Sequence, residues 1–175
     1  MQKISIISAT NRENSYTEKV AFYYKQKLEG MGKEVNLLNL KILGEVVELN
    51  QIYSKNKSEA FNKMVEDFII NTDAFVFVVP EYNGSFPGVL KVFIDAVPPS
   101  SWAEKKVCLT GISTGRAGNL RGMEHLTGVL HYLKLSVYHN RLPISLVDKI
   151  FTNGTNVPDE TSKAIEKQLE GFLKF

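Results

Sequence analysis

One segment, residues 74–79, constrains the fold more than any other. It reads Ala-Phe-Val-Phe-Val-Val, an apolar run in which apolar and polar residues do not alternate. A strand with one face in water shows that alternation, so a strand without it is buried on both faces. Such strands belong to parallel sheets that carry helices on both sides. The segment therefore predicts an α/β protein.

The rest of the chain alternates short apolar runs with segments of helical period. Further strands are expected at residues 4–8, 34–40, 106–113 and 135–139. Helices are expected at residues 15–31, 61–68, 89–97, 123–133 and 165–173. Residues 41–57 fit neither pattern and are expected to be a long connection with some local structure. Five β-α units with right-handed crossovers predict a three-layer α/β/α sandwich around a parallel sheet.

Composition limits what this chain can be. Its 175 residues predict one domain, 1–175, and 43% hydrophobic with 23% charged residues rule out global disorder. The net charge is +2, from 21 basic and 19 acidic residues that are interspersed, which gives no reason to propose a nucleic-acid or membrane partner. No apolar segment approaches the length of a membrane span or a signal peptide. The single cysteine, Cys108, cannot form an intrachain disulfide, so we expect a cytoplasmic protein.

In such folds, ligands bind where the strands end at their carboxyl termini. The loop after the first strand, residues 8–17, carries four hydroxyls beside Arg12 and opens a helix. Hydroxyl, amide and guanidinium donors suit a phosphomonoester. The alternative is an ordinary capping box, because Ser15 and Glu18 match S-x-x-E. The loop alone leaves both interpretations open.

Two other loops follow the third and fourth strands. Residues 80–88 combine an aromatic, an amide and a carboxylate, which could frame a flat heteroaromatic ring, although Asn83-Gly84 alone indicates only a turn. Residues 113–119 contain two glycines and Arg116, a weak signal for ligand contact. Neither G-x-G-x-x-G nor the Walker lysine pattern is present, and the three histidines lack metal-ligand spacing.

Together, the loops resemble those of the NADPH-dependent FMN reductase family of flavodoxin-like proteins, which includes quinone, azo-dye and chromate reductases. The second loop is the most specific match. Pro80-Glu81-Tyr82-Asn83-Gly84-Ser85, followed by Pro87-Gly88-Val89-Leu90-Lys91 and Asp95, fits the family pattern P-E-Y-N-x-S-x-P-G-x-L-K-x-x-x-D. In the first loop, G-S-x-R-x-x-S-x-N is matched with Ala9, Thr10 and Thr17 replacing glycine, serine and asparagine.

The resemblance implies FMN as cofactor, NADPH or NADH as co-substrate, and a flavodoxin-like five-stranded sheet of order 2-1-3-4-5. It implies that the FMN phosphate and the start of the ribityl chain are held by Thr10, Arg12, Ser15, Tyr16 and Thr17. It implies that the isoalloxazine ring is lined by Pro80, Glu81, Tyr82, Asn83 and Gly84, with Ser113, Thr114 and Gly115 on its pyrimidine side. Because the flavin carries the hydride chemistry, no catalytic side chain and no metal ligand is assigned.

The expected function is electron transfer from NAD(P)H through FMN to a small molecule. A quinone, an azo compound, a metal oxyanion and free flavin all remain open as acceptors. The main alternative is a flavodoxin-like carrier that holds FMN without oxidising a nicotinamide, against which the net charge of +2 argues weakly. A domain that has lost its cofactor and only binds a partner is a third possibility.

The helix expected at residues 89–97 is apolar almost all round. We expect a second copy of the chain to cover the excess, in a homodimer or homotetramer, with Phe93 and Val97 at the interface. Trp102 is open to three interpretations: core packing, a place over the flavin, or a subunit contact. Asp95 is expected to make a structural hydrogen bond or a partner contact.

Overall fold

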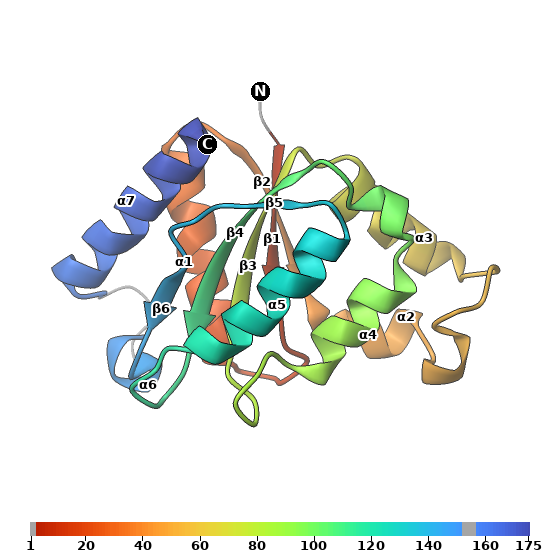
Figure 1. Ribbon diagram of the computed structural model, residues 1–175, viewed down its shortest axis with the longest axis horizontal. Coiled ribbons are helices and arrows are strands. Elements are labelled where there is room, and N and C mark those ends of the chain that lie inside the picture. Colours follow the sequence, from red (N-terminus) through yellow and green to blue (C-terminus); the bar gives the residue numbers. More distant parts are fainter. Residues whose placement is uncertain (1–2, 152–156) are drawn as a thin grey trace.

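A parallel sheet forms the centre of the protein, as the buried run at residues 74–79 predicts. The structure, a computed structural model, describes residues 3–151 and 157–175. The main strands are β1 (Lys3–Ser8), β2 (Glu34–Asn39), β3 (Ala74–Pro80), β4 (Lys106–Ile112) and β5 (Ser136–Val137). They lie in the order β2-β1-β3-β4-β5 and all pair in parallel (Figure 1). The predicted strand order is therefore confirmed.

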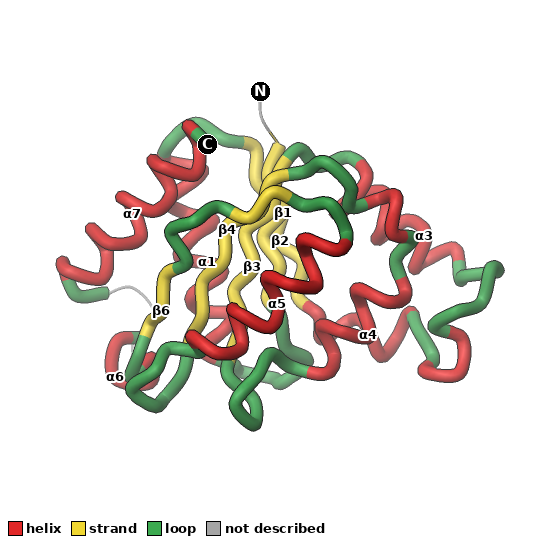
Figure 2. Tube along the Cα trace, viewed as in Figure 1, coloured by secondary structure: helices red, strands yellow, loops and turns green. Residues whose placement is uncertain are grey.

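Helices cover both faces of the sheet (Figure 2). One face carries α1 (Tyr16–Gly30), α6 (Val147–Ile150) and α7 (Asp159–Lys174). The other carries α2 (Leu43–Val46), α3 (Glu59–Val65), α4 (Gly88–Ala96) and α5 (Leu120–Tyr132). The three-layer α/β/α prediction is confirmed. None of the helices in the described part of the chain is long and apolar enough to cross a membrane.

Every residue of β3 is buried, and its side chains alternate between two cores. Phe75 and Phe77 face the α4 and α5 side, whereas Val76 and Val78 face α1 and α7. Trp102 is fully buried in the first of these cores, with its ring centroid 5.4 Å from that of Phe75. Its role is core packing, so neither the flavin nor a subunit contact explains it.

The expectation for helix 89–97 needs correction. Phe93 and Val97 are 0% and 1% exposed, and both pack into this chain's own core rather than at a surface. The helix is apolar on most sides because α4 lies among other elements of the same chain. Only Val89 and Val92 remain partly exposed among its apolar side chains. Asp95 forms an ion pair with Lys91 one turn earlier, at 2.7 Å.

The strand predicted at residues 135–139 is present as β5, although it is shorter than expected. A sixth strand that was not predicted, β6 (Leu142–Ile144), follows it, and both pair with β4. Between β5 and β6, the side-chain amide of Gln168 on α7 bonds backbone groups in place of a neighbouring strand. Its Nε2 donates to the carbonyl oxygens of Leu109 at 3.0 Å and Asn140 at 2.8 Å. Its Oε1 accepts a hydrogen bond from the Tyr24 hydroxyl at 2.7 Å. A side chain far along the sequence thus completes the hydrogen bonding of the sheet.

The connections contain short helical segments. The ambiguous stretch 41–57 holds α2 and two 3₁₀ turns, Leu40–Ile42 and Leu49–Gln51. A π-helical turn, Glu66–Ile70, extends α3, and a 3₁₀ turn, Pro99–Ser101, precedes Trp102. The turn at Leu40–Ile42 follows the carboxyl end of β2 directly, whereas Glu66–Ile70 and Pro99–Ser101 lie before the amino ends of β3 and β4.

Candidate active site at the carboxyl edge of the sheet

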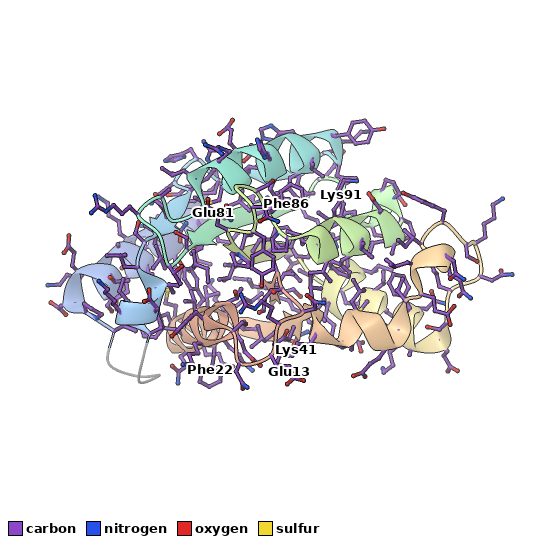
Figure 3. All side chains as sticks on the ribbon, turned by 90° about the horizontal axis from the view of Figure 1, so that it is seen from below. Glu13, Phe22, Lys41, Glu81, Phe86 and Lys91 are labelled. Carbon is purple, nitrogen blue, oxygen red and sulfur yellow. The ribbon has the colours of Figure 1, made fainter. Side chains whose placement is uncertain are left out.

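Three loops meet where β1, β3 and β4 end, at the lower edge of the molecule in Figure 1. They enclose an open cleft of about 240 Å³. Seen from below, Glu13 lies on the α1 side of this edge, whereas Glu81 and Phe86 lie on the side of α4 and α5 (Figure 3). Two larger grooves, of about 660 and 710 Å³, flank α4 and have mainly apolar linings. The smaller cleft is the chemical candidate because it combines hydroxyl, carboxylate and guanidinium groups.

The first loop turns sharply out of β1 and into α1. The N–H group of Ala9 still donates to Val78 on β3, after which the Thr10 Oγ1 accepts from the N–H of Arg12 at 3.2 Å. Asn14 adopts a left-handed conformation (φ 51°), which asparagine tolerates better than most residues. Tyr16 and Thr17 then open α1, where helix geometry offers their N–H groups no acceptor. The start of α1 therefore presents donors to the cleft.

The capping alternative for this loop is half correct. The Ser15 Oγ does cap α1, accepting from the N–H of Glu18 at 3.2 Å. The Glu18 carboxylate, however, forms an ion pair with Lys41 at 3.0 Å. Ser15 capping and an anion held by the first turn of α1 are compatible, because the cap uses only one of the N–H donors there.

The second loop contains a tight hairpin, residues 82–85. Tyr82 and Ser85 exchange two backbone hydrogen bonds, of 2.9 and 3.0 Å. Asn83 and Gly84 between them both have positive φ, 50° and 74°, as a two-residue type I′ turn requires. The loop is anchored to β4 by the N–H of Glu81, which donates to the carbonyl oxygen of Ile112 at 2.9 Å. The Asn83-Gly84 turn expected from the sequence is thus present, on a fixed base.

Side chains also join the first and second loops. The hydroxyls of Thr10 and Tyr82 lie 2.6 Å apart, within hydrogen-bonding distance. The Arg12 guanidinium lies over the Tyr82 ring, 6.0 Å from its centroid. Arg12 forms no ion pair with any carboxylate in the part of the chain that the structure describes, so its positive charge is available to an anionic ligand.

The third loop is held from behind by the segment that follows β6. The Ser113 Oγ donates to the carbonyl oxygen of Gly115 and accepts from the N–H of Gly118, both at 3.0 Å. The N–H of Val147 donates to the carbonyl oxygen of Ser113 at 3.0 Å. The Ser113 hydroxyl therefore stabilises the loop itself, while its backbone and Thr114 border the cleft.

The structure brings most of the predicted site residues to one cleft. Those that line it are Arg12, Ser15, Tyr16, Thr17, Pro80, Glu81, Tyr82, Ser113 and Thr114. Four others do not line it: Thr10 lies buried beneath, Asn83 and Gly84 form the hairpin tip, and Gly115 lies further along the third loop.

Sequence reasoning missed four lining residues, Glu13, Asn14, Ile112 and Val147. Glu13 and Asn14 belong to the first loop, and Ile112 ends β4, so their positions in the sequence could have indicated them. Val147 reaches the cleft only because β6 pairs with β4. No local signal reveals that pairing.

The donor set fits FMN. A phosphate dianion is suited by three groups at the cleft: the Arg12 guanidinium, which has no carboxylate partner among the described residues, the Ser15 hydroxyl and the first N–H groups of α1. Ile112, Val147 and the Tyr82 ring add the apolar surface that suits a planar ring.

Comparison with known proteins agrees with this assignment. The family model for NADPH-dependent FMN reductases matches residues 2–147. A 2-hydroxy-1,4-benzoquinone reductase from a Burkholderia species is 31% identical in an alignment 130 positions long that covers 69% of this chain and 71% of that protein. A quinone reductase of Pseudomonas putida is 25% identical, with 98% of this chain and 88% of that protein covered.

A solved structure shares the fold. It is a flavoenzyme NAD(P)H:(acceptor) oxidoreductase from Paracoccus denitrificans, with a TM-score of 0.82 at 21% identity, covering 99% of this chain and 96% of that one. The family model describes reductases, which favours the enzyme over the flavodoxin-like carrier. The chain belongs to the NADPH-dependent FMN reductase family and is an FMN-dependent NAD(P)H oxidoreductase.

Proposed function

We propose that the cleft holds FMN with its phosphate at the start of α1 and its ring against the second loop. Arg12, Ser15, Tyr16 and Thr17 bind the phosphate, with Thr10 supporting the loop from below. One observation carries this proposal: the Arg12 guanidinium and the first turn of the 15-residue helix α1 lie at the same cleft, and Arg12 has no ion-pair partner among the described residues.

The second and third loops border the ring. Pro80, Glu81 and Tyr82 provide one wall of the cleft, which the hairpin tip at Asn83 and Gly84 extends. Ser113 and Thr114 line the pyrimidine side, which Gly115 extends along the third loop. FMN held there would supply the hydride and electron-transfer chemistry between NADPH or NADH and the acceptor. The chain's own groups bind and orient, and no side chain needs to act as acid, base or nucleophile.

We propose a quinone as the acceptor. Relatives named as quinone reductases support this choice. An open cleft also suits a planar acceptor that replaces the oxidised nicotinamide in turn, which predicts ping-pong kinetics. An azo compound, a metal oxyanion and free flavin are the other acceptors to compare.

The first experiment is the visible absorption spectrum of the purified protein loaded with FMN, recorded without oxygen before and after NADPH or NADH is added. Rapid bleaching of the flavin bands, followed by reoxidation on adding benzoquinone, is expected. Bands that bleach with dithionite but persist with both nicotinamides would instead indicate an electron carrier. A protein that binds no FMN would overturn the cofactor site.

We also propose that two or more copies of the chain associate through the α4 side. The two grooves there share Tyr53 and Pro99, and Tyr53 and Tyr132 are 83% and 85% exposed beside them. Large exposed aromatic side chains along apolar grooves favour a protein interface. Tyr132→Glu should lower the solution mass, whereas Phe22→Glu, on the opposite helix layer, should not. Phe93→Glu cannot serve here, because Phe93 is buried in the core.

A cytoplasmic location completes the proposal. NAD(P)H is the expected donor, and Cys108, the only cysteine, is free and buried.

A further inference from the structure

The 82–85 hairpin rests against the first two turns of α5. Gly122 lies at the point of contact and is buried. A Cβ atom at this position would lie 2.8 Å from the carbonyl carbon of Ser85, which is backbone and cannot move without moving the hairpin. It would also lie 2.1 Å from the Oδ1 of Asn119. Only glycine therefore lets the hairpin approach the helix this closely.

His125, one turn after Gly122 on α5, makes a second contact with the hairpin. Its Nδ1 lies 2.9 Å from the Ser85 Oγ, so the hydroxyl and the imidazole are hydrogen-bonded. Arg121 lies over the hairpin tip, with its Nη1 3.0 Å from where a Gly84 Cβ would be. Positions 121 and 122 both lie on the side of the helix that carries His125, because residues three or four apart are neighbours on its surface.

The start of α5 is itself fixed in place. The Nδ2 of Asn119 donates to the carbonyl oxygen of Val79 at 3.0 Å, one residue before β3 ends and the second loop begins. Further along, Met123, Leu126 and Leu130 are buried in the core. Helix α5 is therefore fixed relative to β3, the strand that the hairpin follows, and supports the hairpin from one side.

We infer that Gly122 and His125 are positioning residues that set the place of the 82–85 hairpin, and through it the FMN affinity and reduction potential. The inference rests on the proposed function, in which the second loop borders the ring. Backbone groups near a flavin tune its potential through hydrogen bonds, so a displaced hairpin changes the relative affinity for oxidised and reduced FMN. Neither residue lines the cleft, so the effect passes through the hairpin.

The first test is Gly122→Ala, with Gly128→Ala as its matched control. Both glycines lie in α5, but a Cβ at Gly128 meets no atom within 4 Å. Gly122→Ala should change the ratio of affinities for oxidised and reduced FMN by about tenfold, which is about 30 mV for a two-electron couple. Gly128→Ala should leave the potential unchanged. Equal potentials in both variants and the wild type would contradict the role of Gly122.

The second test keeps the inference falsifiable if Gly122→Ala does not fold. His125 is exposed, so His125→Ala should fold. His125→Ala and Ser85→Ala should shift the potential alike, and the double variant should shift it no further. His125→Gln, whose amide can bond Ser85, should recover part of the shift, and His131→Ala, an exposed histidine on the same helix, should cause none.

A third readout needs no cofactor. In the protein without FMN, the peptide that contains Ser85 should exchange its amide hydrogens faster in His125→Ala than in the wild type or His131→Ala. Unchanged exchange together with an unchanged potential would overturn the inference while FMN binding by the wild type still supports the proposed function. A wild type that binds no FMN, with faster exchange in His125→Ala, would overturn the proposed function and leave the bracing of the hairpin standing.

Discussion

The hydroxyls of Thr10 and Tyr82 lie 2.6 Å apart, although the two residues are 72 positions apart in the chain. Their hydrogen bond joins the loop after β1 to the loop after β3. The Arg12 N–H also donates to the Thr10 Oγ1, so one hydroxyl bonds both the backbone of the first loop and the side chain of Tyr82 on the second. The two halves of the site are therefore mechanically coupled.

Removing the hydrogen bond between Thr10 and Tyr82 should lower the stability of the protein without FMN. Tyr82→Phe should lower the free energy of unfolding by about 1 kcal/mol, the usual net value of such a hydrogen bond. Urea denaturation of the protein without FMN measures it. The control is Tyr132→Phe, because Tyr132 is 85% exposed and should change nothing. Equal stability of Tyr82→Phe and the wild type would mean that the two loops are not coupled through these hydroxyls.

Arg12 should act on the phosphate and not on the ring. Arg12→Ala should weaken FMN binding roughly 10- to 100-fold, as expected for a hydrogen bond between charged groups. Riboflavin, which lacks the phosphate, should bind both proteins equally. Arg116→Ala, an exposed arginine on the third loop, is the control. Quenching of flavin fluorescence gives the dissociation constants, and an equal loss for FMN and riboflavin would place Arg12 away from the phosphate.

Gln168 should be a strong determinant of stability. Gln168→Leu removes the donor for the carbonyl oxygens of Leu109 and Asn140 and the acceptor for Tyr24. Buried groups left without partners should lower the free energy of unfolding by about 2–4 kcal/mol. Gln26→Leu, on the exposed face of α1, should stay within about 0.5 kcal/mol of the wild type. Similar midpoints for the two variants in urea would show that the strand break needs no such support.

Cys108 predicts how stability depends on pH. Burial raises the pKa of its thiol in the folded protein, so the folded chain keeps a proton that the unfolded chain releases above about pH 8.5. The free energy of unfolding should therefore fall as the pH rises past that value, by up to about 1.4 kcal/mol per pH unit. Cys108→Ala should reduce this slope between about pH 8.5 and pH 9.5, below the ionisation of tyrosine. A slope unchanged by the substitution would assign the effect to other groups.

Much of the fold could be predicted because its strongest signals are local. The unbroken run in β3 requires burial on both faces, and the helical periods between strands require crossovers, so the layers follow. The strand order was expected only from the resemblance to the FMN reductase family. The sixth strand could not be predicted in the same way. β6 is three residues long with Pro143 at its centre, and it forms only because β4 offers a partner and Gln168 closes the gap.

Part of the candidate site could likewise be predicted from local sequence, and part could not. Loops that directly follow strands could be found from the sequence, since strand ends are visible there, and the Asn83-Gly84 turn has a clear local signature. The contact of Gly122 with Ser85 and the approach of Val147 to the cleft depend on tertiary packing. The burial of Phe93 and Val97 was missed for the same reason, because composition alone does not say which neighbours cover a helix.

The gap between β5 and β6 has a consequence for the exposed edge of the sheet. β5 and β6 form one edge of the sheet, and an edge strand is a template on which another molecule can add a strand. Here that template is interrupted after two residues and resumes for only three. A foreign strand would find no continuous row of donors and acceptors to copy. The break therefore hinders the addition of a foreign strand at this edge, whereas the opposite edge strand, β2, runs without interruption for six residues.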